Sequence, residues 1–185
     1  MSNEGEHHHD LHDGRNHGDW KSRYDKSAWY QIIVEISYLV CVLAICITLL
    51  IDACTTKVEP GLVRSSLFNI EISTDKVKWV ALAIAGMIGG IVFDFKWLYH
   101  TVAKGTWNRD RILWRFIVPW NSAMVALFTG FLFASGIVPF LKQESFDEVL
   151  TLMACGFIFG YFSDNVLAAL QNLAQKIFGT LDSEN

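Results

Sequence analysis

Four long apolar stretches constrain the fold of this chain more than any other feature. They cover residues 30–51, 77–97, 116–141 and 149–170, and charged residues interrupt each stretch only near an end. A transmembrane helix needs about 20 apolar residues to cross a hydrocarbon layer of about 30 Å. We therefore predict an all-α fold, a bundle of four transmembrane helices.

The rest of the chain is too short for a sizeable soluble domain, because 52% of its 185 residues are apolar. We predict a polar, histidine-rich, disordered cytosolic tail at 1–28, a membrane domain at 29–170, and the end of an amphipathic helix with a second tail at 171–185. Leu167, Leu170 and Leu173 repeat at helical spacing on one face of that last helix. Ser163 is a candidate N-cap or kink before it, and the helix either extends the fourth span or lies along the membrane surface.

Basic residues predict the orientation of the chain. The N-terminal tail and the loop after the second stretch are denser in Lys and Arg than the other side, so we expect both termini to be cytosolic in a multi-pass inner-membrane protein. The same loop suits anionic lipid headgroups or a cytosolic protein partner. Its candidate binding residues are Lys104, Arg109, Arg111 and Arg115. Nothing in the composition points to nucleic acid.

Each predicted span also holds ionisable residues close to its cytosolic end, which the topology places at one depth. These residues are Glu35, Asp94, Arg111, Arg115 and Asp164. A lone carboxylate in hydrocarbon is costly, so we expect pairs: Asp94 or Glu35 with Arg115, and Asp164 with Arg111 or Lys96. Two interpretations stay open, a structural ring of ion pairs that fixes helix register and a charged vestibule for ions.

Small residues recur every four positions on three spans and predict close helix packing. The positions concerned are Ala85, Gly86, Gly89, Gly90, Ser122, Ala126, Gly130, Gly156 and Gly160. The second span has two such stripes. Because a monomer could leave one stripe free for another subunit, we predict a homo-oligomer.

Two further segments each allow two interpretations. In the loop at 52–76, Phe68, Ile70 and Ile72 alternate with polar residues as in a strand, and the loop is either an external sensor or a packed connection. Pro119 lies one turn inside the third span and predicts a kink, which could also act as a hinge.

The residues do not suggest an enzyme. We find no nucleophile with its base, no phosphate-binding glycine loop and no metal-ligand helix motif. The five histidines of the tail bind metal weakly at best, because a flexible run lacks supporting second contacts. We therefore predict no metal site, no cofactor and no catalysis.

Two short motifs resemble those of small bacterial four-span membrane proteins. One is Trp107-Asn-Arg-Asp-Arg-Ile-Leu-Trp-Arg115 followed by Pro119, and the other is Gly160-Tyr-Phe-Ser-Asp164. Some proteins of that kind resemble membrane subunits of phage-defence systems. The resemblance implies a membrane component that senses damage or forms a pore together with a cytosolic partner.

Two functions follow from these observations. The first is an oligomeric inner-membrane scaffold or channel-type sensor and effector that engages a cytosolic partner, in the antiviral context that the resemblance implies. The alternative is a proton-coupled transporter of small cations in which Glu35 carries the proton, as in small four-helix exporters. Such exporters have tighter loops than this chain and no basic inner collar, and both differences count against this alternative.

Overall fold

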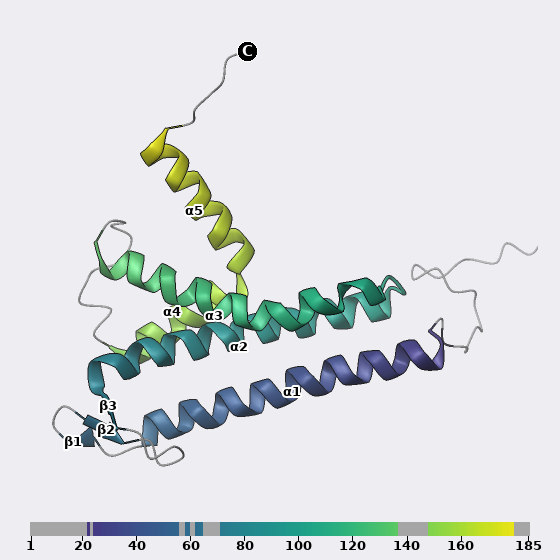
Figure 1. Cartoon of the computed structure of the whole chain (residues 1–185), viewed down its shortest axis with the longest axis horizontal. Helices are drawn as coiled ribbons and strands as arrows, with labels where there is room; N and C mark the ends of the chain where they lie inside the picture. Colours follow the sequence, from purple (N-terminus) through teal and green to yellow (C-terminus); the bar gives the residue numbers. More distant parts are fainter. Residues whose placement is uncertain are drawn as a thin grey trace, which may run out of the picture.

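The protein is predominantly helical in its computed structural model, which describes residues 22, 24–55, 58–59, 62–64, 71–136 and 148–179. Its helices are α1 (Lys26–Thr55), α2 (Thr74–Ala103), α3 (Ile112–Ala134), α4 (Val149–Tyr161) and α5 (Ser163–Phe178), with the short 3-10 helix η1 (Arg109–Arg111) before α3 (Figure 1). By length and composition α1, α2 and α3 can each cross a membrane, and α4 with α5 supplies a fourth crossing if that bent pair is one span.

Local signals explain where these helices begin and end. Asp25 precedes α1, and its Oδ1 accepts a hydrogen bond from the backbone N–H of Ala28 at 2.7 Å, which caps the first turn. Asn108 caps η1 in the same way, through the N–H of Asp110. Gly105 follows α2 with φ of +70°, a conformation that favours glycine and lets the chain turn toward α3.

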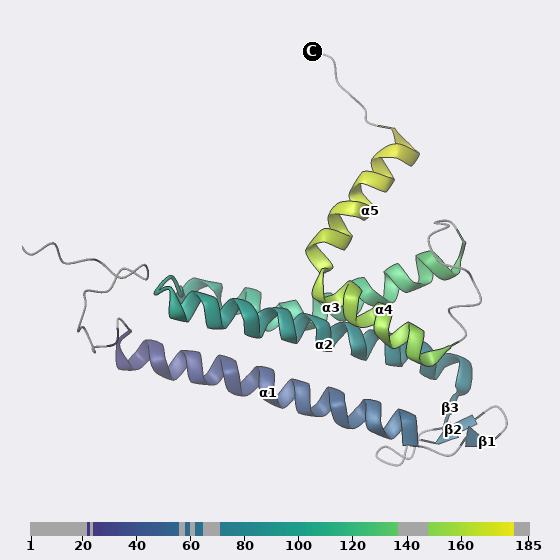
Figure 2. The ribbon, with the colours of Figure 1, turned by 180° about the vertical axis from the view of Figure 1, so that it is seen from behind.

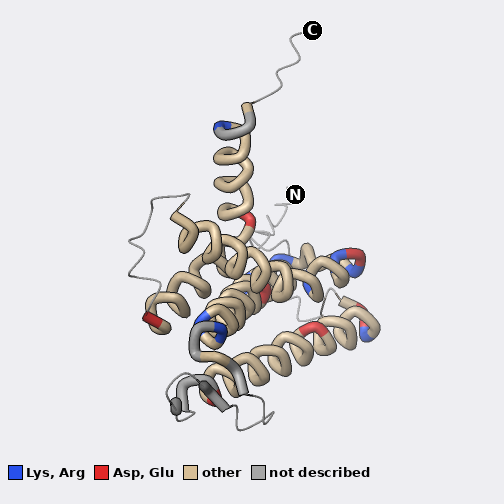
Figure 3. Tube along the Cα trace, turned by 60° about the vertical axis from the view of Figure 1, so that its left-hand side comes forward, with Lys and Arg blue, Asp and Glu red and all other residues tan. Residues whose placement is uncertain are grey.

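Helix α2 is the centre of the bundle. It packs against α3 and α4 along much of its length and against α1 less closely. Figure 2 shows α4 alongside α2, with α1 on the other side of α2. Figure 3 shows that long parts of the helices hold no charged residue. Leu82 and Ile91 of α2 are fully buried, whereas much of the apolar surface of α1 is exposed, as expected of a helix that faces lipid.

The small residues of α2 allow this close packing on two sides. A Cβ on Gly86 would collide with Ala126 of α3, and one on Gly89 would lie 2.7 Å from the backbone nitrogen of Tyr161 at the end of α4. A Cβ on Gly160 would collide with the carbonyl oxygen of Gly86. Both stripes of α2 are therefore used inside one chain. The expectation that one stripe is left for another subunit is wrong, and the argument for a homo-oligomer loses that support.

The described part of the loop after α1 forms a small antiparallel sheet. Its strands are β1 (Val58–Glu59), β2 (Leu62–Arg64) and β3 (Glu71–Ser73), in the order β1-β2-β3. Ile72 lies in β3 and pairs with Val63 of β2, in agreement with the predicted strand. Phe68 and Ile70 lie outside the described residues.

The fourth apolar stretch differs most from its prediction. It was expected to continue as one span over 149–170, but α4 ends at Tyr161 and α5 leaves at 90° to it (Figure 1). Phe162 forms the joint, with φ of −104° and ψ of 30°, and occupies the N-cap position that was expected for Ser163. Ser163, Asp164 and Asn165 follow, and such residues favour turns and helix starts because their side chains compete for backbone hydrogen bonds.

Helices α1 and α2 extend beyond the apolar stretches at 30–51 and 77–97 at both ends. The third stretch was expected to reach 141; α3 ends at Ala134 and continues through Pro119 without interruption. Residues 137–147 lie outside the described residues. The predicted tail at 1–28 overlaps α1, which begins at Lys26, and most of that tail also lies outside the described residues.

Candidate functional site

Polar residues in the N-terminal half of α1 and just before it join this helix to the rest of the bundle. We call Tyr24, Ser27, Gln31, Glu35 and Tyr38 the polar seam. Tyr24 lies just before α1, and the spacing of three or four residues places the other four on one face of the helix. Each of them makes a hydrogen bond to the segment between the end of α2 and the start of α3.

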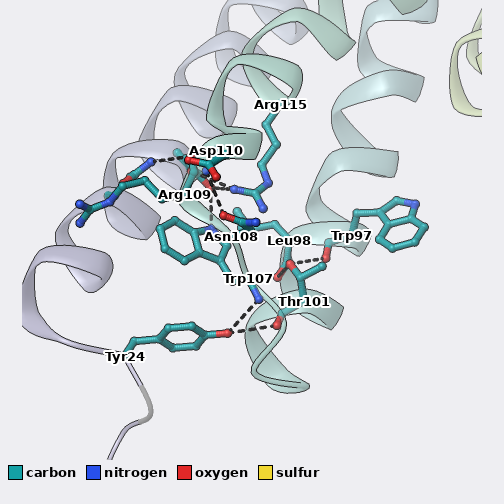
Figure 4. Close-up of polar contacts among 11 residues, drawn as sticks. Tyr24, Trp97, Leu98, Thr101, Trp107, Asn108, Arg109, Asp110 and Arg115 are labelled. Carbon is teal, nitrogen blue, oxygen red and sulfur yellow. Dashed lines mark hydrogen bonds and ion pairs between the residues drawn. The ribbon is translucent and has the colours of Figure 1, made fainter.

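The first half of the seam holds the loop that follows α2. The hydroxyl of Tyr24 donates to the carbonyl of Thr101 at 3.2 Å and accepts from the backbone N–H of Trp107 at 3.1 Å (Figure 4). Arg109 donates to Ser27 at 2.6 Å and to Gln31 at 3.0 Å. Arg109 therefore fastens the loop to α1, and its guanidinium is largely occupied.

The second half of the seam contains a buried ion pair. Nη1 of Arg115 donates to both carboxylate oxygens of Glu35, at 2.8 and 3.0 Å. The indole N–H of Trp107 donates to the same carboxylate at 3.2 Å, and the guanidinium lies 5.6 Å from the centre of the Trp107 ring. Glu35 is 1% exposed and Arg115 is 5% exposed. The predicted pairing of Glu35 with Arg115 is thus formed.

Tyr38 completes the seam one turn further along α1. Its hydroxyl donates to the carbonyl of Phe116 at 3.0 Å and accepts from the indole of Trp120, and its ring stacks on that of Phe116. Pro119 lies in this turn of α3 and has no backbone N–H to offer. The start of α3 is therefore held by side chains of α1.

Asp94 of α2 is the exception in this network. It is 1% exposed, and neither carboxylate oxygen has a hydrogen-bond partner among the described residues. It lies within electrostatic reach of Arg115 and Glu35. Because Glu35 already occupies Arg115, the site contains two buried carboxyl groups and one buried cation. An unpaired carboxyl at this depth is costly, and such groups commonly belong to ion or proton pathways in membrane proteins.

A cavity of about 390 Å³ lies beside this cluster, between the C-terminal part of α2 and the start of α3. Three aromatic side chains of its wall are Phe93, Trp97 and Trp114. Arg111, Arg115 and Asp164 line it as well. Arg111 and Asp164 form no ion pair within the described part of the chain, although both are exposed at this cavity.

The five residues of the predicted charge cluster therefore divide into two groups. Glu35, Asp94 and Arg115 lie together in the buried cluster, whereas Arg111 and Asp164 meet at the cavity. The predicted pairing of Asp164 with Arg111 or Lys96 is not formed. Lys96 instead donates to the hydroxyl of Tyr161 at 3.3 Å.

Sequence reasoning missed most of the polar seam. Tyr24, Ser27, Gln31 and Tyr38 were not singled out, although their regular spacing with Glu35 is visible in the sequence. Trp107 was named only as the first residue of a motif, yet it is 9% exposed and bonded to Glu35. A search for polar residues at intervals of three and four along the first apolar span and the residues just before it would have found the seam.

Metal chemistry gains no support from this arrangement. Among the residues that the structure describes, no group of three or more His, Cys, Asp and Glu side chains could hold a metal ion. The histidine-rich part of the tail falls outside that search.

Compared with family models, curated proteins and solved structures, the chain shows no match.

Proposed function

We propose that the protein is a membrane-embedded scaffold or channel-type sensor and effector subunit that engages a cytosolic protein through α5. The observation that supports this most is the 90° break after α4, which turns α5 away from the bundle. A span that only crosses the bilayer has no need of such a helix. An amphipathic helix in this position suits attachment along the inner membrane surface.

The sequence of α5 supports this placement. Val166, Leu167, Leu170 and Leu173 lie on one face, and Leu167 is 44% exposed. The opposite face is polar. It contains Asp164, Asn165, Gln171, Asn172, Gln175 and Lys176. With the apolar face in the membrane, the polar face is open to a cytosolic protein.

The loop contributes less to a docking surface than its charge suggests. Arg115 is buried against Glu35, and Arg109 is bonded to Ser27 and Gln31. Of the basic residues of this loop that the structure describes, only Lys104 and Arg111 present exposed charges free of such contacts. We therefore place the partner's contacts on the polar face of α5. The inner-membrane location and the role in antiviral defence belong to this proposal.

Crosslinking in the native cells tests the proposal. A photoreactive phenylalanine analogue is placed at Gln171 or Gln175 on the polar face, and at Leu167 or Leu173 on the apolar face as matched controls. We expect one cytosolic protein to be captured from both polar positions and from neither apolar position. Capture only of lipid, or only of a second copy of this chain, from the polar positions would contradict the proposal.

A second function is favoured by Asp94 alone, namely ion-coupled transport. The expectation named Glu35 as the coupling carboxyl, but Glu35 is held by Arg115 and Trp107. Asp94 has the free carboxyl, so the transport proposal moves to that residue. Both proposals allow a channel-type activity, and they differ in whether a titrating carboxyl is required.

Proton flux into vesicles containing the purified protein separates the two functions. In the transport proposal, Asp94→Asn abolishes substrate-driven proton flux, and the exposed control Glu148→Gln on the opposite side leaves it intact. Flux that is absent from the parent protein, or unchanged by Asp94→Asn, would exclude the transport function. The crosslinks from α5 would be unaffected in either case.

A further inference from the structure

The break after α4 leaves a groove between α2 and α3 unfilled. Over most of its length α4 lies against α2 and α3, and its last residue, Tyr161, packs its ring edge-on against Phe93 with centroids 6.0 Å apart. Beyond this point the chain leaves at 90°. Phe93, Trp97 and Thr101 continue along the same face of α2 and line the cavity. The cavity is thus the part of the groove that α4 does not cover.

The position of the cavity indicates an amphiphilic occupant. Trp97 and Trp114 border it, and Trp side chains are typical of the membrane–water boundary. One end is aromatic and lies at the depth of the buried cluster, and the other reaches the polar loop at Asp110 and Arg111. A groove at this depth that no helix fills is exposed to the inner leaflet. A phospholipid matches it, with its headgroup spanning the cavity between Arg111 and Asp164.

The charges of the cavity select among phospholipid headgroups. The charge of Arg115 is balanced by Glu35, which leaves Arg111 as the cation and Asp110 and Asp164 as carboxylates. Arg111 suits a phosphate. The carboxylates and aromatic faces suit an ammonium group, and a primary ammonium can also donate hydrogen bonds to the carboxylates.

We propose that this cavity binds one phospholipid with a phosphoethanolamine headgroup, its phosphate on Arg111 and its ammonium on Asp164 among the aromatic rings. An anionic headgroup without an amine would leave the two carboxylates facing a negative ligand. A choline headgroup would keep the contact with the rings but lacks N–H donors. The proposal does not depend on the function of α5 or of Asp94.

Native mass spectrometry of the delipidated full-length protein tests this site. Dioleoyl phosphatidylethanolamine, phosphatidylglycerol and phosphatidylcholine are titrated separately, and the occupancy of the first bound lipid is measured. We expect phosphatidylethanolamine to bind first and with a stoichiometry of one. Arg111→Gln and Asp164→Asn should each weaken it by about tenfold, the effect of one lost hydrogen bond to a charged group.

Matched controls exclude a general effect of charge or of hydrophobicity. Lys104→Gln removes an exposed cation, Glu148→Gln removes an exposed carboxylate on the other side, and Phe128→Ala removes an exposed aromatic ring of α3 away from the cavity. None should change the first binding event. The thermal melting of each variant verifies that it is folded.

Three results would overturn the proposal. If all three lipids bind equally and no variant alters their binding, the lipid surrounds the whole bundle instead of occupying this cavity. Preference for phosphatidylglycerol, lost in Arg111→Gln but not in Asp164→Asn, indicates a phosphate site without amine recognition. Absence of any discrete first binding event, in a protein that melts normally, indicates that the cavity holds no specific lipid.

Discussion

At the scale of single residues, the buried pair of Glu35 and Arg115 is the strongest polar contact between α1 and the rest of the bundle. Its side chains are 1% and 7% exposed, so solvent screens it little. The pair joins helices that otherwise make little contact, because α1 packs loosely against α3. We infer that the pair fixes the register of α1 on the bundle, the structural one of the two interpretations that the sequence left open.

Removal of one partner of this pair should destabilise the protein strongly. Glu35→Gln leaves the Arg115 guanidinium buried without its carboxylate, and we expect a loss of about 3–5 kcal/mol in the free energy of unfolding. The double variant Glu35→Leu with Arg115→Met should recover most of it, because neither charge is then buried. The measurement is unfolding by SDS in mixed micelles.

The control for this double-mutant cycle of Glu35 and Arg115 is Arg109→Gln. It removes a cation from exposed contacts with Ser27 and Gln31, so its cost should be about 1 kcal/mol. A double variant whose loss equals the sum of the two single losses would show that Glu35 and Arg115 do not act as a pair.

The sequence predicted that charged residues would meet at one depth but not which of them would bond. Asp94 and Glu35 were both candidates for Arg115, and the choice depends on the loop. Trp107 and Asn108 bring α3 in beside α1, with the Trp107 indole on Glu35. Such a three-dimensional detail does not follow from spacing along separate helices.

At the scale of elements, glycine determines how closely α2 and α4 approach. Gly160→Ala places a Cβ against the backbone of Gly86, which cannot move unless the two helices separate. We expect a loss of about 1–3 kcal/mol in unfolding free energy, reduced by the better helix propensity of Ala, which contributes about 1 kcal/mol. SDS unfolding measures it.

Gly130→Ala is the matched control on α3. Its Cβ would lie 3.0 and 3.2 Å from the two terminal methyl carbons of Leu82, the end of a side chain that can rotate away. We expect a clearly smaller loss than for Gly160→Ala. If the two substitutions cost the same, the close approach of α2 and α4 would not be the reason for glycine at position 160.

The glycine pattern also shows where prediction from sequence reaches its limit. Spacing of four residues correctly predicted that helix backbones touch at Gly86, Gly90 and Gly160. The spacing could not show how many neighbouring helices one helix contacts. Helix α2 is central, and its glycines contact two helices on different sides. Spacing alone does not show this, so the second stripe was assigned to another subunit.

Helix α5 should contribute little to the stability of the bundle. Its first residue, Ser163, is buried with its hydroxyl 3.4 Å from that of Ser122, but the following residues contact the bundle sparsely. A chain ending at Asn165 keeps this contact and the cavity residue Asp164. We expect its midpoint of thermal unfolding to change by only a few degrees, which corresponds to about 1 kcal/mol or less.

A large fall in that midpoint would mean that α5 is part of the folded core. Such a result would also weaken the proposal that α5 is a docking element, because a core helix has no free polar face to offer. Loss of the crosslinks from α5 positions in the shortened chain is expected in any case and does not discriminate.

At the scale of the whole molecule, three helices can each cross a membrane and one bent pair follows them, so the side of the C-terminus depends on that pair. The contact of Tyr24 with Thr101 and Trp107 places the start of α1 and the loop after α2 at the same end of the bundle (Figure 4). At 1.5 Å per residue, the 13 residues of α4 cover about 20 Å, less than the hydrocarbon layer of about 30 Å. Helix α4 alone is therefore too short to cross such a layer.

Two topologies follow from this geometry, and the cavity distinguishes them. In one, α5 lies along the inner surface and the C-terminus is on the side of the N-terminus; in the other, α4 and α5 form a re-entrant pair and the C-terminus returns outside. Asp164 lines the same cavity as Arg111, a residue of the basic loop. Since Asp164 at the start of α5 shares this cavity with Arg111, we expect the first topology.

Paired reporters at the C-terminus test this expectation. Green fluorescent protein fluoresces only when it remains in the cytosol, and alkaline phosphatase is active only outside it. We expect fluorescence without phosphatase activity for fusions after Asn185 and at Lys104, and the reverse for an insertion beside Glu148. Phosphatase activity at Asn185, with fluorescence retained at Lys104, would establish the re-entrant topology. The polar face of α5 would then be directed away from the cytosol, and the partner proposed for it would have to be an extracytoplasmic protein.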